Sequence, residues 1–288
     1  MAASARLAPA KVNLFLHVGP LGADGYHPLA SLAAFADVGD RLTVEPADRL
    51  SLALTGPFAG ALQGEGDNLV LRAVRMLGTA AGVGEPGLRI TLDKQLPVAA
   101  GLGGGSSDAG AVLKLARDVL DLPLDEAALA GIAADLGADG PLCLQARAAW
   151  AEGRGDVLTF ETALPPLSAL LVNPGVPSST GAVYRAFDVA PPGRADRPAS
   201  PALWDVACVI DWLAVQRNDL QAPAVALAPA IGQALAAVVA LPGVRLTRMS
   251  GSGATVFALF DTAAAAEAAG KVLADLHPDW WNRPTTLR

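Results

Sequence analysis

The chain has 288 residues, of which 52% are hydrophobic and 17% charged, with a formal net charge of −7 at pH 7. This composition excludes a disordered chain and predicts a sizeable core in one large domain or two of ordinary size. The acidic balance speaks against nucleic acid or a membrane surface as partner, so any bound anion must be held by local geometry.

Apolar periodicity in the first part of the chain predicts strands and helices in mixed order. Strands are expected at residues 7–18, 41–44, 50–54 and 88–92. Helices are expected from about 67 to 81, from behind two serines to about 120, and from about 125 to 136. On the first strand, Lys11 and Asn13 should share a face, because alternate side chains of a strand point the same way.

The second part continues with a strand at 169–172 and helices near 180–187, 203–215 and 228–240. Strands at 245–249 and 255–260 flank a loop of small residues, and a helix at 262–276 follows. Residues 191–201 are expected as a surface loop. Mixed strands and helices without regular alternation predict an α+β fold with two lobes, residues 1–160 and 161–288.

Cysteines and apolar runs indicate the compartment. Cys143 and Cys208 lack metal-ligand or disulfide spacing and lie in apolar surroundings, which predicts buried thiols in a reducing compartment. The first residues lack the apolar stretch of a signal peptide. The uncharged segment between Asp219 and Arg245 is alanine-rich and interrupted by prolines, which favours a core helix over a membrane span. We therefore expect a cytoplasmic protein.

The most informative motif is PVAAGLGGGSSDAG, residues 97–110. Residues 97–107, here called the glycine loop, let backbone N–H groups point into one concavity at the positive end of a helix, where Ser106, Ser107 and Asp108 would be the N-cap residues. This predicts a phosphate site, with a flexible turn as the alternative. The loop has neither the lysine of a Walker A motif nor the GxGxxG pattern of dinucleotide-binding enzymes and protein kinases.

Two charged residues are candidates for catalysis. Lys11 lies among apolar residues, either as a strand-edge lysine in water or as a charge that stabilises a transferring phosphoryl group. Asp139 follows a helix, either as a turn or cap residue or, if it faces Lys11, as a general base. No H-E-x-x-H motif, Cys/His cluster or Ser/His/Asp arrangement is present, so metalloprotease and serine hydrolase are poor hypotheses.

Two turns could contribute to a binding site. Tyr26 and His27 follow a tight turn and could offer a stacking face and an imidazole to a base or sugar. Residues 250–253, here called the serine–glycine loop, form a second stretch of bare backbone. Taken in isolation, each pattern is more typical of an ordinary hairpin turn.

Taken in order, PAKVNLFLHV, ADGYHPL, the glycine loop, LGADGP and MSGSGATVF resemble the GHMP kinase superfamily over residues 6–260. The ADGYH element resembles the branch that acts on 4-diphosphocytidyl-2-C-methyl-D-erythritol in the non-mevalonate isoprenoid pathway. This resemblance implies a ribosomal-protein-S5-like N-terminal lobe and a ferredoxin-like C-terminal lobe. It also implies in-line phosphoryl transfer from ATP, with Mg²⁺, to the C2 hydroxyl of that cytidine diphosphate-linked polyol.

The resemblance also implies roles for individual residues. Asp139 would take the proton of the C2 hydroxyl, and Lys11 would orient that hydroxyl and stabilise charge. The cytidine end would be held by Asn13, Tyr26, His27, Thr180 and Tyr184. ATP would be bound by Pro97, Gly101, Leu102, Gly103, Gly104, Gly105, Ser106, Ser107, Asn68 and Lys94. The Mg²⁺ ligands are not assigned by the sequence, with Ser107 as one candidate.

Two glycines depart from the family pattern. Gly140 stands where a β-branched residue is usual, and we expect it to loosen the backbone beside Asp139. Gly110 replaces an alanine at a helix penalty of about 1 kcal/mol at most.

Three other functions remain as alternatives. One is a kinase of another small alcohol, such as homoserine or mevalonate, which offers no base for the aromatic residues to stack on. A second is a nucleotide or sugar-phosphate sensor without catalysis. The third, a dinucleotide-dependent oxidoreductase, lacks its fingerprint and its βαβ series.

Overall fold

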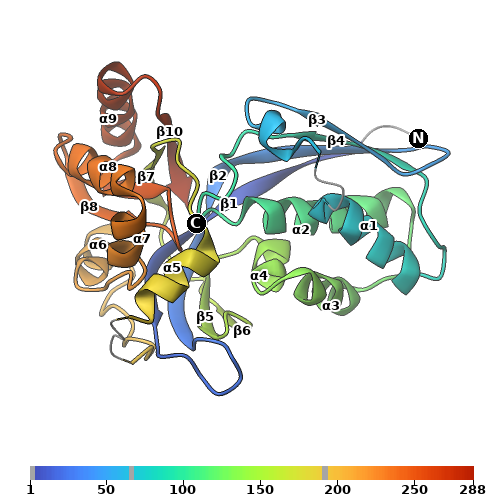
Figure 1. Ribbon diagram of the computed structural model, residues 1–288, viewed down its shortest axis with the longest axis horizontal. Helices are drawn as coiled ribbons and strands as arrows, with labels where there is room; N and C mark the ends of the chain where they lie inside the picture. The colour runs from blue at the N-terminus through green and yellow to red at the C-terminus, as the bar shows by residue number, and fades with distance from the viewer. Residues whose placement is uncertain (1–3, 65–67, 190–193) are drawn as a thin grey trace. The chain divides into compact units, whose positions relative to one another are not determined.

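The computed structural model describes residues 4–64, 68–189 and 194–288, which form two compact units (Figure 1). The first unit comprises Met1–Ala10, Val38–Val98 and Gly103–Ala146, and the second comprises Lys11–Asp37, Ala99–Leu102 and Arg147–Arg288. Two long strands, β1 (Ser4–Val18) and β2 (Leu29–Pro46), contribute to both units. The predicted lobes, divided at residue 160, stay a prediction.

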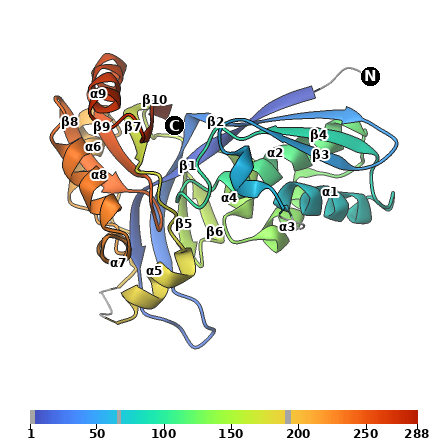
Figure 2. The ribbon, with the colours of Figure 1, turned by 45° about the horizontal axis from the view of Figure 1, so that its top comes forward.

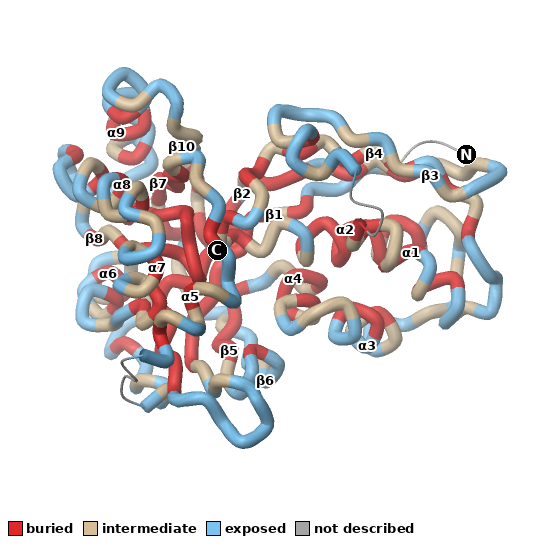
Figure 3. Tube along the Cα trace, in the orientation of Figure 1, coloured by how far each residue is buried: buried red, intermediate tan, exposed pale blue. Residues whose placement is uncertain are grey.

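The first unit packs helices against one face of a small sheet (Figure 2). Strand β4 (Leu88–Asp93) pairs antiparallel with the second half of β2 and parallel with β3 (Ser51–Thr55). The short 3-10 helix η1 (Ala59–Leu62) follows β3. Helices α1 (Leu69–Ala80), α2 (Gly104–Val119), α3 (Glu126–Leu136) and α4 (Gly140–Gln145) complete the unit. Figure 3 shows burial along most of α2, which makes it the central helix of this core.

The second unit is built around β7 (Leu167–Asn173), which pairs antiparallel with β9 (Val256–Phe260) and β10 (Trp281–Leu287). Strand β8 (Val244–Met249) lies outside β9, and β5 (Ala149–Gly153) joins the first half of β2 to β6 (Val157–Phe160). Helices α8 (Pro229–Val239) and α9 (Ala263–Leu276) share a core with β7 and β9. Helices α5 (Thr180–Phe187), α6 (Val206–Ala214) and α7 (Gln221–Leu227) complete the unit.

The expected α+β composition is confirmed, and the predicted elements occur near their expected places. The expectations did not include the first half of β2, strands β5, β6 and β10, or helices α4 and α7. Strand β10 has the sequence WNRPTTL, in which polar residues and a proline hide the strand signal. Of the expected surface loop, residues 191–193 lie outside the described residues, and residues 194–201 form neither helix nor strand.

Two further expectations concern buried and apolar segments. Cys143 on α4 is buried, whereas Cys208 on α6 is only half-buried, so the expectation was wrong for Cys208. It lies three residues after Asp205, which caps α6, at the exposed start of the helix. Among the described residues, no single helix is long and apolar enough to cross a membrane. Helices α7 and α8 reach the length and apolar composition of a membrane span only when taken together, and they bend by 119° at their junction.

Candidate functional site

The glycine loop enters α2 differently from the expectation. The helix begins at Gly104, and Gly103 occupies the N-cap position with φ of 63°. Ser106 and Ser107 therefore lie inside the first turn, and the prediction that they cap the helix with Asp108 was wrong. No side chain in the described residues caps α2, because glycine at the N-cap has none to offer. The first N–H groups of this 16-residue helix therefore suit an anion.

The upstream part of the loop is anchored through its backbone in the second unit. The carbonyl of Leu102 accepts a 2.8 Å hydrogen bond from the amide of Lys11, and the carbonyl of Gly101 accepts one of 2.8 Å from Ser250 Oγ. Gly101 has φ of 73°, and a Cβ there would lie 2.3 Å from the carbonyl oxygen of Ser250. Only glycine fits this contact.

The serine–glycine loop is more than a plain hairpin turn, because its side chains join other parts of the second unit. Ser250 Oγ, besides its bond to Gly101, accepts a 3.2 Å bond from the amide of Asn13. Ser252 Oγ lies 2.9 Å from Thr180 Oγ1 at the start of α5. The loop thus connects the strand that carries Lys11 and Asn13 to the helix that carries Tyr184.

A buried asparagine that the sequence analysis missed holds this loop in place. Asn218 Nδ2 donates 2.8 Å hydrogen bonds to the carbonyls of Met249 and Gly251. Its two neighbours form hydrogen bonds with Leu16 of β1. The amide of Leu16 donates to the carbonyl of Arg217, and the amide of Asp219 donates to the carbonyl of Leu16, both at 2.9 Å. Polar residues in an otherwise apolar stretch were the available signal, but their partners are distant in sequence.

Lys11 and Asn13 share a face of β1, as predicted. Lys11 Nζ donates a 2.9 Å hydrogen bond to Asn13 Oδ1, and both residues are buried, with relative exposures of 5% and 7%. Asn13 Nδ2 in turn donates to Ser31 Oγ at 2.8 Å. Lys11 is therefore not a strand-edge lysine in water, and its ammonium group has a fixed position.

Asp139 belongs to the first unit and occupies the N-cap position of α4, although its side chain makes no cap hydrogen bond. The neighbouring Gly140 does not loosen the backbone as expected, since a Cβ there would lie 1.8 Å from the carbonyl oxygen of Ala133. This glycine allows the start of α4 to pack directly against α3, so the backbone next to Asp139 is tightly packed. Gly110 similarly lets α2 approach Leu144. The predicted pairing of Asp139 with Lys11 stays a prediction.

The aromatic residues expected at the cytidine end lie in the second unit. The ring centroid of His27 is 4.9 Å from that of Tyr184, and His27 Nε2 lies 2.7 Å from Asp188 Oδ1. Tyr26 is 54% exposed, and the guanidinium of Arg154 lies 4.5 Å from its ring centroid. An exposed ring with its face against a cation suits stacking with a flat base.

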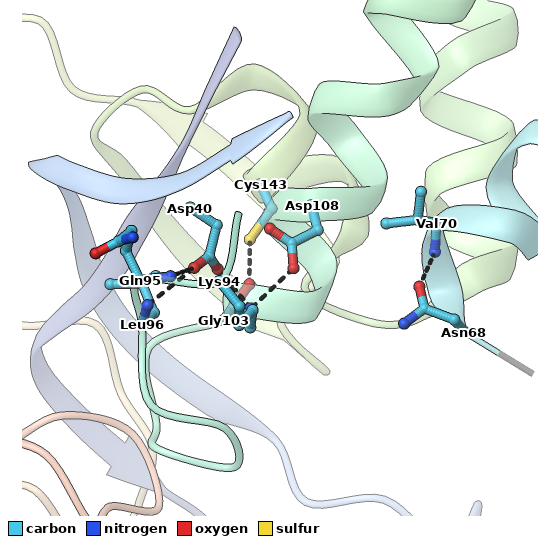
Figure 4. Close-up of polar contacts among 9 residues, drawn as sticks. All are labelled: Asp40, Asn68, Val70, Lys94, Gln95, Leu96, Gly103, Asp108 and Cys143. Carbon is cyan, nitrogen blue, oxygen red and sulfur yellow. Dashed lines mark hydrogen bonds and ion pairs between the residues drawn. The ribbon is translucent and has the colours of Figure 1, made fainter. Parts of the chain in front are cut away.

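The two residues expected in the adenosine pocket have structural partners in the first unit (Figure 4). Asn68 caps α1, its Oδ1 accepting a 2.9 Å bond from the amide of Val70. Lys94 Nζ, which is buried, contacts Asp40 Oδ2 at 2.5 Å and Asp108 Oδ2 at 2.8 Å. Burial, together with the charge of Asp40, raises the pKa of Asp108 to about 7 against the opposing effect of Lys94. Contact of Asn68 or Lys94 with a nucleotide stays a prediction.

A metal ion would depend on few protein ligands. The described residues contain no group of three or more His, Cys, Asp or Glu placed to hold a metal. The Ser107 hydroxyl is buried without a hydrogen-bond partner in the described part of the chain. Such a hydroxyl oxygen, beside a predicted phosphate site, would suit one ligand of a Mg²⁺ ion whose other ligands are mainly nucleotide oxygens.

Comparison with known families and proteins gives the relationships of the chain. Residues 68–146 match the GHMP kinases N terminal domain, and residues 207–278 match the GHMP kinases C terminal domain. The 4-diphosphocytidyl-2-C-methyl-D-erythritol kinase of Caulobacter vibrioides (strain NA1000 / CB15N) is 52% identical over 97% of this chain and 98% of that protein. The kinase of the same name from Methylobacterium radiotolerans is 51% identical over 98% of each chain.

Solved structures agree with these sequence matches. A crystal structure of 4-(cytidine 5'-diphospho)-2C-methyl-D-erythritol kinase superposes with a TM-score of 0.80 at 36% identity, covering 99% of both chains. Homoserine kinase from Cytophaga hutchinsonii, with a TM-score of 0.66 and 17% identity over 100% of this chain and 95% of its own, shows the common fold alone. The chain therefore belongs to the GHMP kinases and, within them, to the 4-diphosphocytidyl-2-C-methyl-D-erythritol kinase family.

Proposed function

We propose that this kinase transfers the γ-phosphoryl group of ATP to the C2 hydroxyl of 4-diphosphocytidyl-2-C-methyl-D-erythritol. The observation that carries the proposal is 52% identity over 97% of the chain to a relative that bears this substrate in its name. Homoserine and mevalonate kinases share the fold at only 17% and 12% identity, so likeness to them says nothing about substrate.

The residues of the second unit support a cytidine-linked acceptor. Tyr26 offers an exposed ring face, while His27 and Tyr184 form an aromatic pair beside Asp188. Small acceptors such as homoserine have no base to stack on these rings. Asn13, fixed by Lys11 and Ser31, adds an amide that can orient a polar group of the substrate.

For the transfer itself, Asp139 would accept the proton of the C2 hydroxyl while Lys11 orients that hydroxyl and stabilises the developing charge. The fixed position of Lys11 Nζ suits this role, because phosphoryl transfer depends mainly on positioning and on preorganised charge. Gly140, packed against Ala133, would keep the N-cap position of Asp139 constant during turnover.

The glycine loop would hold the phosphates of ATP through its backbone N–H groups and the N-terminus of α2. Ser107 would contribute its buried hydroxyl to Mg²⁺. When bound, Mg²⁺ neutralises charge on the phosphate oxygens. In this arrangement, the protein would supply alignment and the exclusion of water.

The test is phosphoryl transfer from labelled ATP by purified protein to 4-diphosphocytidyl-2-C-methyl-D-erythritol, with homoserine and mevalonate as competing acceptors. We expect transfer to the cytidine-linked acceptor only. Tyr26→Ala should raise KM for this acceptor and leave KM for ATP unchanged. Transfer to homoserine or mevalonate instead would overturn the substrate assignment and keep the kinase.

The catalytic pair is tested by Asp139→Asn and Lys11→Met in single-turnover experiments. Each change should lower the transfer rate by about 100-fold or more, the usual size of general-base catalysis and of charge stabilisation. Asp135→Asn, an exposed acid on α3, is the matched control and should leave the rate unchanged. A wild-type rate in Asp139→Asn would remove Asp139 from the mechanism.

A further inference from the structure

Three buried charged residues in the first unit form a cluster, here called the clamp, that consists of Asp40, Lys94 and Asp108. Their relative exposures are 0%, 3% and 2%. The ammonium of Lys94 lies between the two carboxylates, as Figure 4 shows. The second oxygen of Asp40 accepts bonds from the amides of Gln95 and Leu96 at 2.7 and 2.8 Å.

The clamp involves the residues that flank the glycine loop on both sides. Its Asp40 holds the amides of Gln95 and Leu96, which lead directly into Pro97 and the loop. Its Asp108 lies in the second turn of α2, the helix that the loop enters at Gly104. A Cβ at Gly104 would lie 3.2 Å from Lys94 Nζ, so the first residue of the helix also lies directly over the clamp.

The charges explain why the three residues act together. Two carboxylates and one ammonium are all removed from water, and both carboxylates contact the same ammonium. Loss of either Lys94 or Asp108 therefore changes the position of the remaining groups. Because Lys94 already donates to both acids and is buried, its ammonium is poorly available to a nucleotide.

We propose that Asp40, Lys94 and Asp108 are positioning residues that fix the spacing between the two ends of the glycine loop, so that its N–H groups are aligned for nucleotide phosphates. This inference rests on the proposed function for the ATP site, and it assigns Lys94 a role through Asp108 and Asp40 instead of direct contact.

The experiment measures binding of ADP, with Mg²⁺, to the full chain by calorimetry. Asp108→Ala removes the contact with Lys94, whereas Asp108→Asn removes the charge and keeps an oxygen that can accept the bond. We expect Asp108→Ala to weaken ADP binding about tenfold, through misplaced loop amides, and Asp108→Asn to restore most of the affinity. Asp118→Ala, an exposed acid on the same helix, is the control and should bind like the wild type.

Simple electrostatics predicts a different pattern, in which loss of a negative charge tightens ADP binding equally in Asp108→Ala and Asp108→Asn. That result, or wild-type ADP affinity in Asp108→Ala, would overturn the proposed positioning role of the clamp. Lys94→Met combined with Asp108→Ala should be no weaker than the worse single variant, because the two residues act through one contact. Additive losses would instead indicate direct contact of Lys94 with the nucleotide.

Hydrogen exchange separates positioning from a general loss of folding. In Asp108→Ala, amides of residues 101–107 should exchange faster, while those of β3 keep wild-type rates. Faster exchange across the whole unit would mean a merely structural role and would contradict the proposal. If the wild type binds ADP but phosphorylates none of the acceptors, the proposed function fails while the clamp is still tested by ADP affinity.

Discussion

The clamp of the first unit and the contacts around the serine–glycine loop of the second unit use different kinds of hydrogen bond. In the first unit, the clamp relies on one buried ammonium that contacts two buried carboxylates. In the second unit, Asn218 and Ser250 use neutral amide, hydroxyl and carbonyl groups. Within the described part of the chain, even the buried Arg248 donates to carbonyls, those of Leu14, Leu213 and Gln216.

This difference has consequences for how each unit responds to change. A buried charge that loses its partner keeps a large desolvation cost, and its protonation can relieve that cost. A neutral carbonyl that loses its donor has a smaller cost, which no change of pH relieves. Burial lowers the pKa of Arg248 to about 10, so that its guanidinium stays charged near neutral pH. Variants of buried residues in the two units should therefore differ in how their loss of unfolding free energy depends on pH.

The largest effect is expected for Lys94→Met. It leaves Asp40 and Asp108 buried without their ammonium and should lower the free energy of unfolding by about 3–5 kcal/mol at pH 8. The loss should be smaller at pH 5, because Asp108, with a pKa already raised to about 7, is then protonated. Urea unfolding at the two pH values measures both losses. An equal loss at pH 5 and pH 8 would contradict this account of two buried acids that share one ammonium.

The second effect is expected for Arg248→Met, which leaves three buried carbonyls without their donor. The free energy of unfolding should fall by about 3 kcal/mol, and this loss should change little between pH 5 and pH 8, because no carboxylate is left without its partner. Arg283→Met, on an exposed arginine of β10, serves as the control and should cost little. A strong pH dependence in Arg248→Met would remove the contrast between the units.

A smaller effect is expected for Asn218→Ala. The carbonyls of Met249 and Gly251 lose their shared donor, at a cost of about 2 kcal/mol in unfolding free energy. Since the serine–glycine loop also bonds to Asn13 and Thr180, KM for the cytidine-linked acceptor should rise. Steady-state kinetics with both substrates checks this, and an unchanged acceptor KM would show that the loop does not position the acceptor site.

The smallest effect concerns His17, a titratable group of the second unit. Burial lowers the pKa of His17, against a weaker opposing contribution from its bond to the carbonyl of Asp196. The folded chain therefore binds a proton at His17 less readily than the unfolded chain does. The contribution of neutral His17 to the free energy of unfolding is present above pH 6.5 and is lost as the pH falls below that value. His17→Gln should flatten that part of the stability curve. Chemical unfolding between pH 5 and 7.5 measures it, and an unchanged slope would contradict the burial argument.

The comparison also shows what sequence can and cannot predict. Alternation on β1 correctly placed Lys11 beside Asn13, because this signal is local. The phosphate site that the clustered glycines indicate stays a prediction. The start of α2 was misplaced because serines next to a helix usually cap it, whereas here Gly103 takes that position. The helix therefore begins two residues before Ser106.

Contacts between distant segments could not be predicted in the same way. Asp40 meets Lys94 54 residues away, and Asn218 holds carbonyls more than 30 residues away, so neither role has a local pattern. The same holds for Gly140, whose place is fixed by Ala133 on another helix. The roles of such glycines and buried polar groups depend on packing against residues that are distant in the sequence.

The central claim, that the chain phosphorylates the C2 hydroxyl of 4-diphosphocytidyl-2-C-methyl-D-erythritol, is tested most directly by ³¹P NMR of the reaction product. C2 of this polyol carries a methyl group and no hydrogen, so a phosphate at C2 has no three-bond coupling to a proton. We predict one new phosphomonoester signal that is unsplit by protons. A doublet or triplet would place the phosphate on a secondary or primary hydroxyl and contradict the claim, and so would the absence of any new signal while ATP is bound.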